Sequence, residues 1–396
     1  MTVSARPDAA AKAHSQRLYS RIRDEMNDQD GKLSFHRFME LVLYEPGLGY
    51  YSAGASKLGE AGDFVTAPEI SPLFSRCIAR QCHQVLGVLG DADILEVGAG
   101  SGSMACEILI ELERTNALPG RYFILDISAD LRARQGALIR QRIPHLAQRV
   151  HWLDRLPGKG FRGVVLANEI LDAMPVHRVH IGKNDVQEYC VKPEDDRFVW
   201  CLQDLTRAQL QQRTGLIRAM LGKELDEAGY TTEINLAAES WIGNISDMLE
   251  SGLALIIDYG FPRREYYHPE RSEGTLMCHY RHHAHADPLV NIGLQDITAH
   301  IDFTAIAEAA CITGLNVAGF TNQAYFLLGC GLLDIAGIPV LERAGQQSIS
   351  DIRQAQEIKK LTLPHEMGEL FKVLALTRAI DVSLLGFTLR DDRGRL

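Results

Sequence analysis

Five short runs of apolar residues divide the chain, at residues 94–97, 122–125, 150–153, 163–167 and 253–257. The first run is followed by Met104, Ile108 and Leu112, a spacing of four that is typical of one face of an α-helix. Continuous apolar strands that alternate with helices indicate a parallel sheet buried on both faces. The pattern therefore predicts an α/β fold with a Rossmann-like sheet.

The fourth and fifth runs are separated by about 80 residues, far beyond the length of a usual crossover. Two alternating segments, around 179–181 and 188–191, flank a turn at Gly182–Asp185, which predicts a hairpin. We expect a further strand at 198–202, followed by helices. The sequence thus predicts a large insertion subdomain at 176–250.

Helical patterns also precede and follow the sheet. Ser71 and Pro72 can cap a helix whose apolar positions continue to residue 89. An apolar stretch at 324–340, interrupted by glycines, is interpreted as a buried helix because it is too short and too broken for a membrane span of roughly 20 residues. We therefore expect an N-terminal helical extension and a helical C-terminal segment.

The sharpest local motif is the glycine-rich segment Glu96–Gly102, which joins the first strand to its helix. Glycines there let the backbone pass close to a ligand, and the helix N-terminus offers free N–H groups. The spacing of Gly98, Gly100 and Gly102 is G-x-G-x-G, whereas a dinucleotide site has G-x-G-x-x-G. An acid at Glu96 suits a ligand with an ammonium group, such as the methionine part of S-adenosylmethionine. A tight connection without a ligand and a dinucleotide site are the alternatives.

Acidic and polar residues follow the other strands. Asp126 ends the second strand, where a carboxylate can accept hydrogen bonds from both hydroxyls of a ribose. Asn168, Glu169 and Asp172 follow the fourth strand, at the edge where open α/β sheets bind ligands. Asn168 could touch a cofactor, and Glu169 and Asp172 would face one pocket if the segment turned helically. The alternative for the two acids is a favourable interaction with a helix dipole.

Composition limits the classes of partner. The chain of 396 residues has 46% hydrophobic and 23% charged residues, as in a folded globular protein. Its net charge of -10 argues against nucleic-acid binding and favours a cationic partner. The eight cysteines contain no C-x-x-C pair, and the stretch with Cys278, His279, His282, His283 and His285 lacks zinc-ligand spacing, so we expect reduced thiols and no metal.

Further motifs run through most of the chain. They are Arg37-Phe38-Met39, Tyr44-Glu45-Pro46, Gly49-Tyr50-Tyr51, Gly62-Asp63-Phe64, Glu69-Ile70-Ser71, Glu96 to Gly102, Asn168-Glu169, Asp172 to Val176, Ile257 to Gly260, Gly274-Thr275-Leu276 and Gln295 to Phe303. In these segments the chain resembles the MidA family of methyltransferases. The mitochondrial member of this family methylates an arginine in a core subunit of respiratory complex I during assembly. Asp126 stands where many relatives have Glu, a change that preserves hydrogen bonding to ribose.

The resemblance implies a class I methyltransferase core and S-adenosylmethionine as cofactor. It implies cofactor contacts from Gly98, Gly100, Gly102 and Asp126, with contributions from Asp63 and Asn168, and we add Glu96 from the charge argument. Glu169 and Asp172 are the candidate catalytic residues. For substrate binding the candidates are Glu69, Thr275, His300 and Asp302.

These expectations divide the chain into five segments. They are an N-terminal extension with a cofactor-covering loop (1–90), the first half of the core (91–175), the insertion (176–250), the second half of the core with a substrate loop (251–330) and a C-terminal helical segment (331–396).

The function expected is a protein arginine N-methyltransferase acting on a complex I subunit. The alternatives are a methyltransferase acting on an oxygen or nitrogen of a small molecule or peptide, and an assembly factor that binds the cofactor but mainly holds a partner. We expect a cytoplasmic bacterial protein, or a protein of the mitochondrial matrix in a eukaryote, without membrane insertion. A homodimer is one oligomeric state that the sequence leaves open.

Overall fold

The computed structural model describes residues 7–53, 66–225, 228–337 and 349–396. The chain divides into two compact units, and each is discontinuous in sequence. Unit 1 comprises residues 1–64, 171–240 and 261–302, and unit 2 comprises 65–170, 241–260 and 303–396. The segment 1–90, which we expected to form one extension, is therefore divided between the units, and so is the insertion 176–250.

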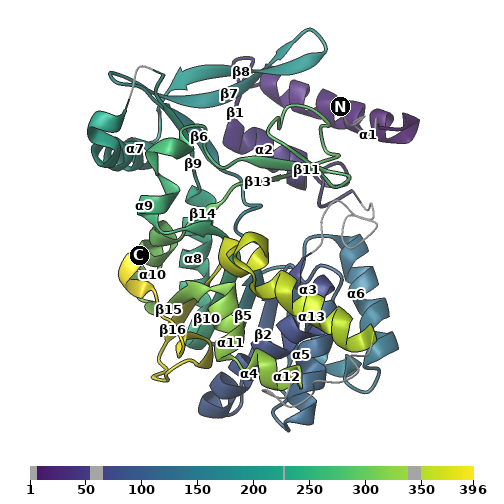
Figure 1. The fold of residues 1–396 in the computed structure, drawn as a ribbon. Helices are drawn as coiled ribbons and strands as arrows, with labels where there is room; N and C mark the ends of the chain where they lie inside the picture. The colour runs from purple at the N-terminus through teal and green to yellow at the C-terminus, as the bar shows by residue number, and fades with distance from the viewer. Residues whose placement is uncertain (1–6, 54–65, 226–227, 338–348) are drawn as a thin grey trace. The chain divides into compact units, whose positions relative to one another are not determined.

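Unit 2 contains a sheet whose strands run in the order β15-β16-β10-β5-β2-β3-β4. Figure 1 labels β15, β16, β10, β5 and β2 of this sheet. The strands are β2 (Asp93–Val97), β3 (Tyr122–Leu125), β4 (Val150–Leu153), β5 (Phe161–Asn168), β10 (Leu249–Phe261), β15 (Asn316–Asn322) and β16 (Phe371–Arg378). All five predicted strands are confirmed, and they pair in parallel. Strand β16 is antiparallel to both β10 and β15, an arrangement that differs from the 3-2-1-4-5-6 order of dinucleotide-binding folds.

Both faces of this sheet are buried. Ile94, Val164 and Leu253 pack in one cluster with helices on one face. The alternate residues Leu95 and Val165 are equally buried although they lie outside that cluster, so they face the other side. The α/β fold class expected from the apolar runs is confirmed.

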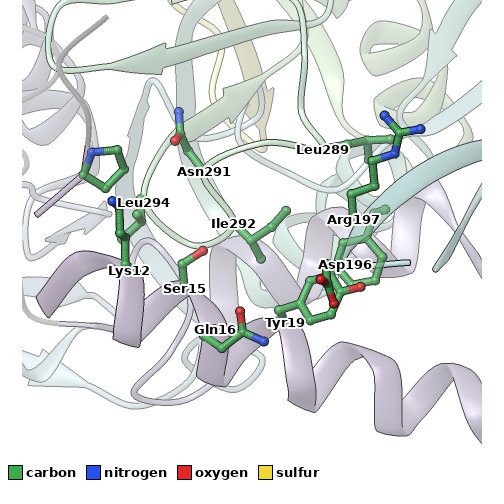
Figure 2. Close-up of a pocket in the computed structure, with 12 residues that line it drawn as sticks. Lys12, Ser15, Gln16, Tyr19, Asp196, Arg197, Leu289, Asn291, Ile292 and Leu294 are labelled. Carbon is green, nitrogen blue, oxygen red and sulfur yellow. The ribbon is translucent and has the colours of Figure 1, made fainter. Parts of the chain in front are cut away.

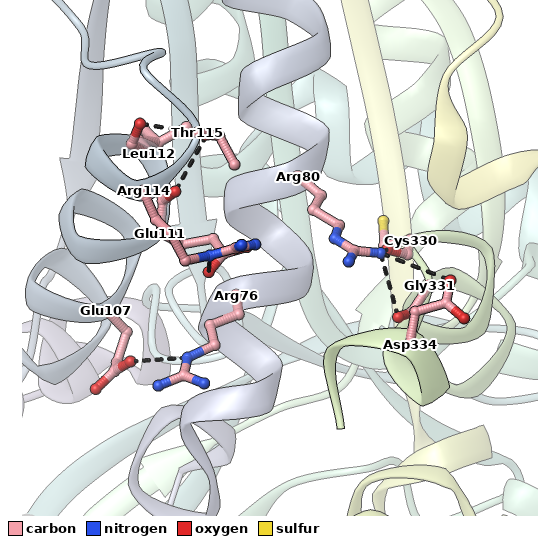
Figure 3. A network of polar contacts seen from close by, with 10 residues as sticks. All are labelled: Arg76, Arg80, Glu107, Glu111, Leu112, Arg114, Thr115, Cys330, Gly331 and Asp334. Atoms are coloured by element: carbon pink, nitrogen blue, oxygen red, sulfur yellow. Dashed lines mark hydrogen bonds and ion pairs between the residues drawn. The ribbon is translucent and has the colours of Figure 1, made fainter. Parts of the chain in front are cut away.

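The helices of unit 2 are α3 (Ala67–Ile70), α4 (Pro72–Leu89), α5 (Ser103–Arg114), α6 (Ala129–Arg142), α10 (Phe303–Ile312), α11 (Gln323–Gly329), α12 (Leu332–Ile335) and α13 (Ile349–Thr362). The predicted capping is confirmed, because the Ser71 hydroxyl accepts a hydrogen bond from the Leu73 N–H at 3.3 Å. Buried Glu107 of α5 pairs with Arg76 of α4 at 3.2 Å and with Arg142 of α6 at 2.5 Å. Figure 3 shows the first of these pairs beside the contacts of Arg80 in α4 with the carbonyls of Cys330 and Gly331, which precede α12, and with Asp334 in α12.

The C-terminal segment corrects one expectation. We expected residues 331–396 to be helical, and this is wrong for residues 371–378, which form the inner strand β16. A short apolar run, such as residues 373–376 within this strand, cannot be assigned to a buried strand or a buried helix from its periodicity alone. The stretch 324–340 is also no single helix, since α11 and α12 are separate and residues 338–340 lie outside the described residues.

Unit 1 contains two smaller antiparallel sheets. One has the order β1-β7-β6-β9, with β8 paired to β7, and is built from β1 (Leu33–Ser34), β6 (His177–Ile181), β7 (Val186–Glu194), β8 (Arg197–Asp204) and β9 (Tyr230–Ile234). The predicted β6–β7 hairpin and the further strand β8 are confirmed. The other sheet has β12 (His283–His285), β11 (Met277–Tyr280) and β13 (Asp296–Thr298).

The helices of unit 1 are α1 (Ala9–Asn27), α2 (Phe35–Tyr44), α7 (Ala208–Leu221) and the short α9 (Arg263–Tyr266), and α8 (Leu236–Met248) crosses the boundary between the units. One core of this unit gathers Leu18, Ile22, Phe35 and Phe38 from the first two helices with Val191 of β7. In the described part of the chain, no helix is long and apolar enough to cross a membrane.

Candidate functional site

The glycine-rich turn of unit 2 lies between β2 and α5. Gly98, Gly100 and Gly102 have φ angles of 65°, 53° and 87°, in the left-handed region that favours glycine. Gly102 is the N-cap of α5 and has no side chain to cap it, so N–H groups of the first turn can bind a ligand. These features fit a ligand that approaches the backbone closely.

Asp126 follows β3 and is buried. One carboxylate oxygen accepts a hydrogen bond from the Ser128 N–H at 2.9 Å, and the other accepts one from the Gln135 amide at 2.8 Å. Burial raises the pKa of Asp126 above its ordinary value, while these two hydrogen bonds act in the opposite direction. A carboxylate has about four acceptor positions, so both oxygens keep capacity for the hydroxyls of a ribose.

Gln135 connects the predicted cofactor residues, and sequence reasoning missed it. Its amide nitrogen donates to the Gly100 carbonyl at 3.0 Å as well as to Asp126, and its oxygen accepts from the Trp152 indole at 2.8 Å. A side chain added at Gly102 would lie 3.3 Å from the Gln135 Cα. Gln135 therefore fixes the Asp126 carboxylate relative to the glycine turn. Its position on α6, with no motif around it, gave no sequence signal.

Glu96 lies beneath the turn and is 1% exposed. Its carboxylate accepts a hydrogen bond from the Tyr122 hydroxyl at 2.7 Å. Burial raises the pKa of Glu96 to about 7 from an ordinary value of 4.5, and the charge of Asp126 also raises it, whereas the bond from Tyr122 lowers it. The Glu96 carboxylate is closed off from solvent in unit 2. Direct contact between Glu96 and an ammonium group therefore remains a prediction.

This raised pKa makes stability depend on pH. The unfolded chain releases the Glu96 proton near pH 4.5 and the folded chain near pH 7, so the folded state binds more protons between these values and loses stability as the pH rises through them. We expect the Tm of Glu96→Gln, measured by calorimetry relative to that of the unmodified protein, to increase as the pH rises from about 5 to about 8. Glu250→Gln, on an exposed carboxylate, is the control, and parallel Tm curves for Glu96→Gln and the unmodified protein would contradict the prediction.

Glu69 of α3 contacts the same turn. Its carboxylate accepts a hydrogen bond from the Ser101 hydroxyl, which also lies 2.9 Å from the Ser103 hydroxyl. The structure thus places Glu69 beside the cofactor motif, whereas we expected it to bind the substrate. Asp63 lies outside the described residues.

Asn168 ends β5 in unit 2, and Glu169 follows it. The Asn168 amide donates to the Glu169 carboxylate at 3.1 Å, and the buried Asn168 oxygen has no hydrogen-bond partner in the structure. Glu169 has a φ of 54°, and its N–H donates to the Ile257 carbonyl at 2.9 Å. The helical turn expected to place Glu169 and Asp172 on one face is therefore wrong, because Glu169 leaves the strand in the left-handed conformation.

Asp172 belongs to unit 1 and is buried there with Asp296. The Tyr51 hydroxyl donates to Asp296 at 2.8 Å, and the Tyr44 hydroxyl donates to the Ala173 carbonyl at 2.9 Å. The two tyrosine rings stack with centroids 5.5 Å apart. Burial raises the pKa of Tyr44, and the charges of Asp296 and Asp172 raise it further. We call Tyr44, Tyr51, Asp172 and Asp296 the tyrosine–carboxylate cluster.

The segment expected to bind substrate lies in unit 1. The Thr275 N–H and hydroxyl both donate to the buried carboxylate of Glu233, at 2.7 and 3.2 Å, and the Thr275 hydroxyl oxygen accepts from the His300 N–H at 3.1 Å. The structure thus brings Thr275 and His300 together. Asp302 pairs with Arg263 at 3.3 Å. The adjoining backbone is tied to the cluster, since the Ala299 N–H donates to the Asp172 carbonyl at 3.0 Å.

Unit 1 also contains a cavity of about 370 Å³ between α1, the β7–β8 turn and the loop at 289–294 (Figure 2). Its lining combines apolar Tyr19 and Ile292 with charged Lys12, Asp196 and Arg197. None of the sequence-predicted site residues lines this cavity, so it does not affect the assignment of those residues.

The cysteine and histidine stretch forms the β11–β12 hairpin, in which Cys278 lies opposite His285. All eight cysteines are free. Among the residues that the structure describes, no group of three or more His, Cys, Asp or Glu side chains could hold a metal ion.

The sheet order with antiparallel β16, the left-handed glycine turn and the buried carboxylate after β3 define a class I S-adenosylmethionine-dependent methyltransferase. Residues 77–321 match the Methyltransf_28 family of S-adenosyl-L-methionine-dependent methyltransferases, and the chain belongs to this family. Its cofactor is S-adenosylmethionine.

Solved structures agree with this assignment. A COG1565 superfamily protein of Burkholderia thailandensis, crystallised with S-adenosyl-homocysteine, is 42% identical with a TM-score of 0.91, and the match covers 99% of each chain. A native crystal structure from the same organism is also 42% identical over 99% of each chain, with a TM-score of 0.89.

Curated relatives are more distant. The protein arginine methyltransferase NDUFAF7 homolog of Drosophila melanogaster, a mitochondrial protein, is 27% identical, and the match covers 93% of this chain and 87% of the relative. The NDUFAF7 protein of Danio rerio is 26% identical, with 87% and 83% covered.

Proposed function

We propose that this methyltransferase modifies an arginine side chain of a substrate protein. We propose further that this substrate is a subunit of respiratory complex I, which is methylated during assembly. The names of the curated relatives support arginine as the acceptor, and the family resemblance supports complex I. The observation that carries the proposal is the tyrosine–carboxylate cluster of unit 1.

The cluster has the chemistry that a guanidinium requires. A guanidinium is planar, remains charged and presents five N–H donors, so it pairs with carboxylates and stacks on aromatic faces. Asp172 and Asp296 supply carboxylates, and Tyr44 and Tyr51 supply stacked rings. Both tyrosines belong to the motifs that carry the family resemblance. In this proposal the cluster recognises the arginine.

S-adenosylmethionine supplies a methyl group on a sulfonium, and transfer forms a nitrogen–carbon bond as the sulfur–carbon bond breaks. The guanidinium nitrogen must lose a proton as the bond forms, because arginine is protonated near neutral pH. Glu169, the first residue after β5, is proposed to orient the nitrogen and accept this proton, and Asp172 is proposed to orient the guanidinium. The protein otherwise contributes alignment of the reacting groups.

The target residue can be tested directly. We expect purified enzyme with methyl-labelled S-adenosylmethionine to label the isolated complex I subunit, and to leave a version with Arg→Lys at the modified position unlabelled. Lysine keeps the charge but lacks the planar fork of donors. The measurement is label in the subunit, with the site located by mass spectrometry.

Equal labelling of the lysine version would overturn arginine as the acceptor. If neither version is labelled while a small molecule is methylated rapidly, the small-molecule alternative is favoured. Normal complex I assembly by a variant that binds no cofactor would favour the assembly-factor alternative.

The names of the curated relatives place them in mitochondria. For this chain we propose a cytoplasmic location in a bacterium, or the mitochondrial matrix in a eukaryote, which cell fractionation tests. The homodimer that the sequence leaves open is tested by light scattering of the purified protein.

A further inference from the structure

Asp258, near the carboxyl end of β10, is completely buried. Its Oδ2 accepts a hydrogen bond from the N–H of Ile170 at 3.2 Å, and its Oδ1 accepts one from the N–H of Tyr259 at 2.8 Å. The residue before Ile170 is Glu169, whose N–H donates to the Ile257 carbonyl. Consecutive residues of β10 therefore hold consecutive N–H groups of the segment that follows β5.

These two contacts end the ladder between the strands. β5 and β10 pair in parallel as far as Asn168, which lies opposite Ile257. The Ile170 N–H, further along the chain, donates to the side chain of Asp258 instead of to a backbone carbonyl. At this point the backbone of Glu169 takes a φ of 54°. A residue other than glycine persists in the left-handed region only where its surroundings hold it there.

The same turn borders the cofactor motif. A side chain added at Gly98 would overlap the end of the Ile170 side chain, so Ile170 packs directly against this glycine. The hydrogen bond from Ile170 to Asp258 thus locates two groups at once. They are the Glu169 carboxylate and the apolar side chain beside the glycine turn.

We propose that Asp258 is a positioning residue for methyl transfer, which holds the left-handed turn at Glu169 and Ile170 and so places the Glu169 carboxylate relative to the glycine turn. The inference rests on the proposed function, since it takes Glu169 as the residue that orients the acceptor. In this inference Asp258 acts through the turn that it holds, by accepting the hydrogen bond from the Ile170 N–H.

A binding experiment tests the turn without any acceptor. We expect Asp258→Ala to weaken S-adenosylhomocysteine binding about fivefold or more in calorimetry, because the turn relaxes away from Gly98. Adding Glu169→Gly should restore the affinity to within about twofold, because glycine adopts a positive φ at little cost. Asp258→Asn should be intermediate, since its amide oxygen can still accept one of the two N–H groups.

The control is Glu107→Ala, which removes another buried carboxylate of unit 2, one that pairs with Arg76 of α4. It should lower Tm and leave the affinity unchanged. The inference is overturned if Asp258→Ala binds S-adenosylhomocysteine normally. It is also overturned if adding Glu169→Gly fails to restore the affinity of Asp258→Ala, or that of Asp258→Asn, which we expect to fold better than the alanine variant.

A kinetic cycle links the turn to transfer. With the labelled complex I subunit as acceptor, we expect Asp258→Ala to lower kcat about tenfold in the unmodified enzyme and to have little further effect in the Glu169→Gln background. Additive losses would overturn the inference alone. No loss from Glu169→Gln would overturn the proposed role of Glu169, while the glycine rescue in the binding experiment would still support the turn.

Discussion

Replacement of Gly98 by valine is expected to abolish binding of S-adenosylhomocysteine. Gly98 has a φ of 65°, which a β-branched residue adopts only with strain, and an added side chain would overlap Ile170. The turn must therefore rearrange, and the N–H groups that face the ligand move with it. We expect the affinity to fall at least about a hundredfold in calorimetry, equivalent to roughly 2.8 kcal/mol.

Gly87→Ala is the matched control, because Gly87 lies in α4 and a side chain added there meets no atom within 4 Å. This variant should bind normally and gain up to about 1 kcal/mol of stability, since alanine favours a helix over glycine. Tight binding by Gly98→Val would show that the glycine turn does not approach the cofactor. Tight binding of NADH by the unmodified protein would contradict the choice of cofactor.

The sheet of unit 2 could be predicted where its signal is local. The runs at β2, β3, β4, β5 and β10 are short, continuous and bounded by turn residues, which is how buried parallel strands are encoded. Strand β16 has an equally apolar sequence but follows helix α13, and it pairs with β10 and β15 from far along the chain. Its assignment depends on those long-range partners, which periodicity does not reveal.

The cofactor residues were predictable for the same reason. Gly98, Gly100 and Gly102 form a motif whose spacing reflects backbone conformation, and Asp126 is found by its place after a strand. Gln135 and Tyr122 were missed because each acts through one side chain that meets the motif only in the folded chain. The tyrosine–carboxylate cluster likewise joins segments more than a hundred residues apart.

Glu169 and Asp172 do not share one helical face in the structure, and this changes what can be expected of their variants. The sequence placed them on one helical face, where either substitution would act on one pocket. In the structure Glu169 follows β5 in unit 2, and Asp172 belongs to the cluster in unit 1. The two side chains therefore have different surroundings, and their variants should differ in kinetic signature.

We expect Glu169→Gln to lower kcat on the order of a hundredfold or more, with S-adenosylhomocysteine affinity nearly unchanged, because glutamine keeps the shape of the side chain but cannot accept the proton. Asp172→Asn should also bind the cofactor nearly normally, with transfer reduced by a similar factor. Steady-state kinetics with the labelled complex I subunit, beside calorimetry with S-adenosylhomocysteine, measure both quantities.

The variants Glu169→Gln and Asp172→Asn should differ in their KM for the acceptor protein. Asp172 is proposed to bind the guanidinium before and during transfer, so its loss should raise KM for the acceptor, whereas the loss of a proton acceptor should appear in kcat alone. Glu113→Gln, on a carboxylate at the surface end of α5, is the control and should leave both constants unchanged. Equal losses of cofactor affinity and rate in Glu169→Gln would instead make Glu169 a cofactor ligand, and the proton would then need another acceptor.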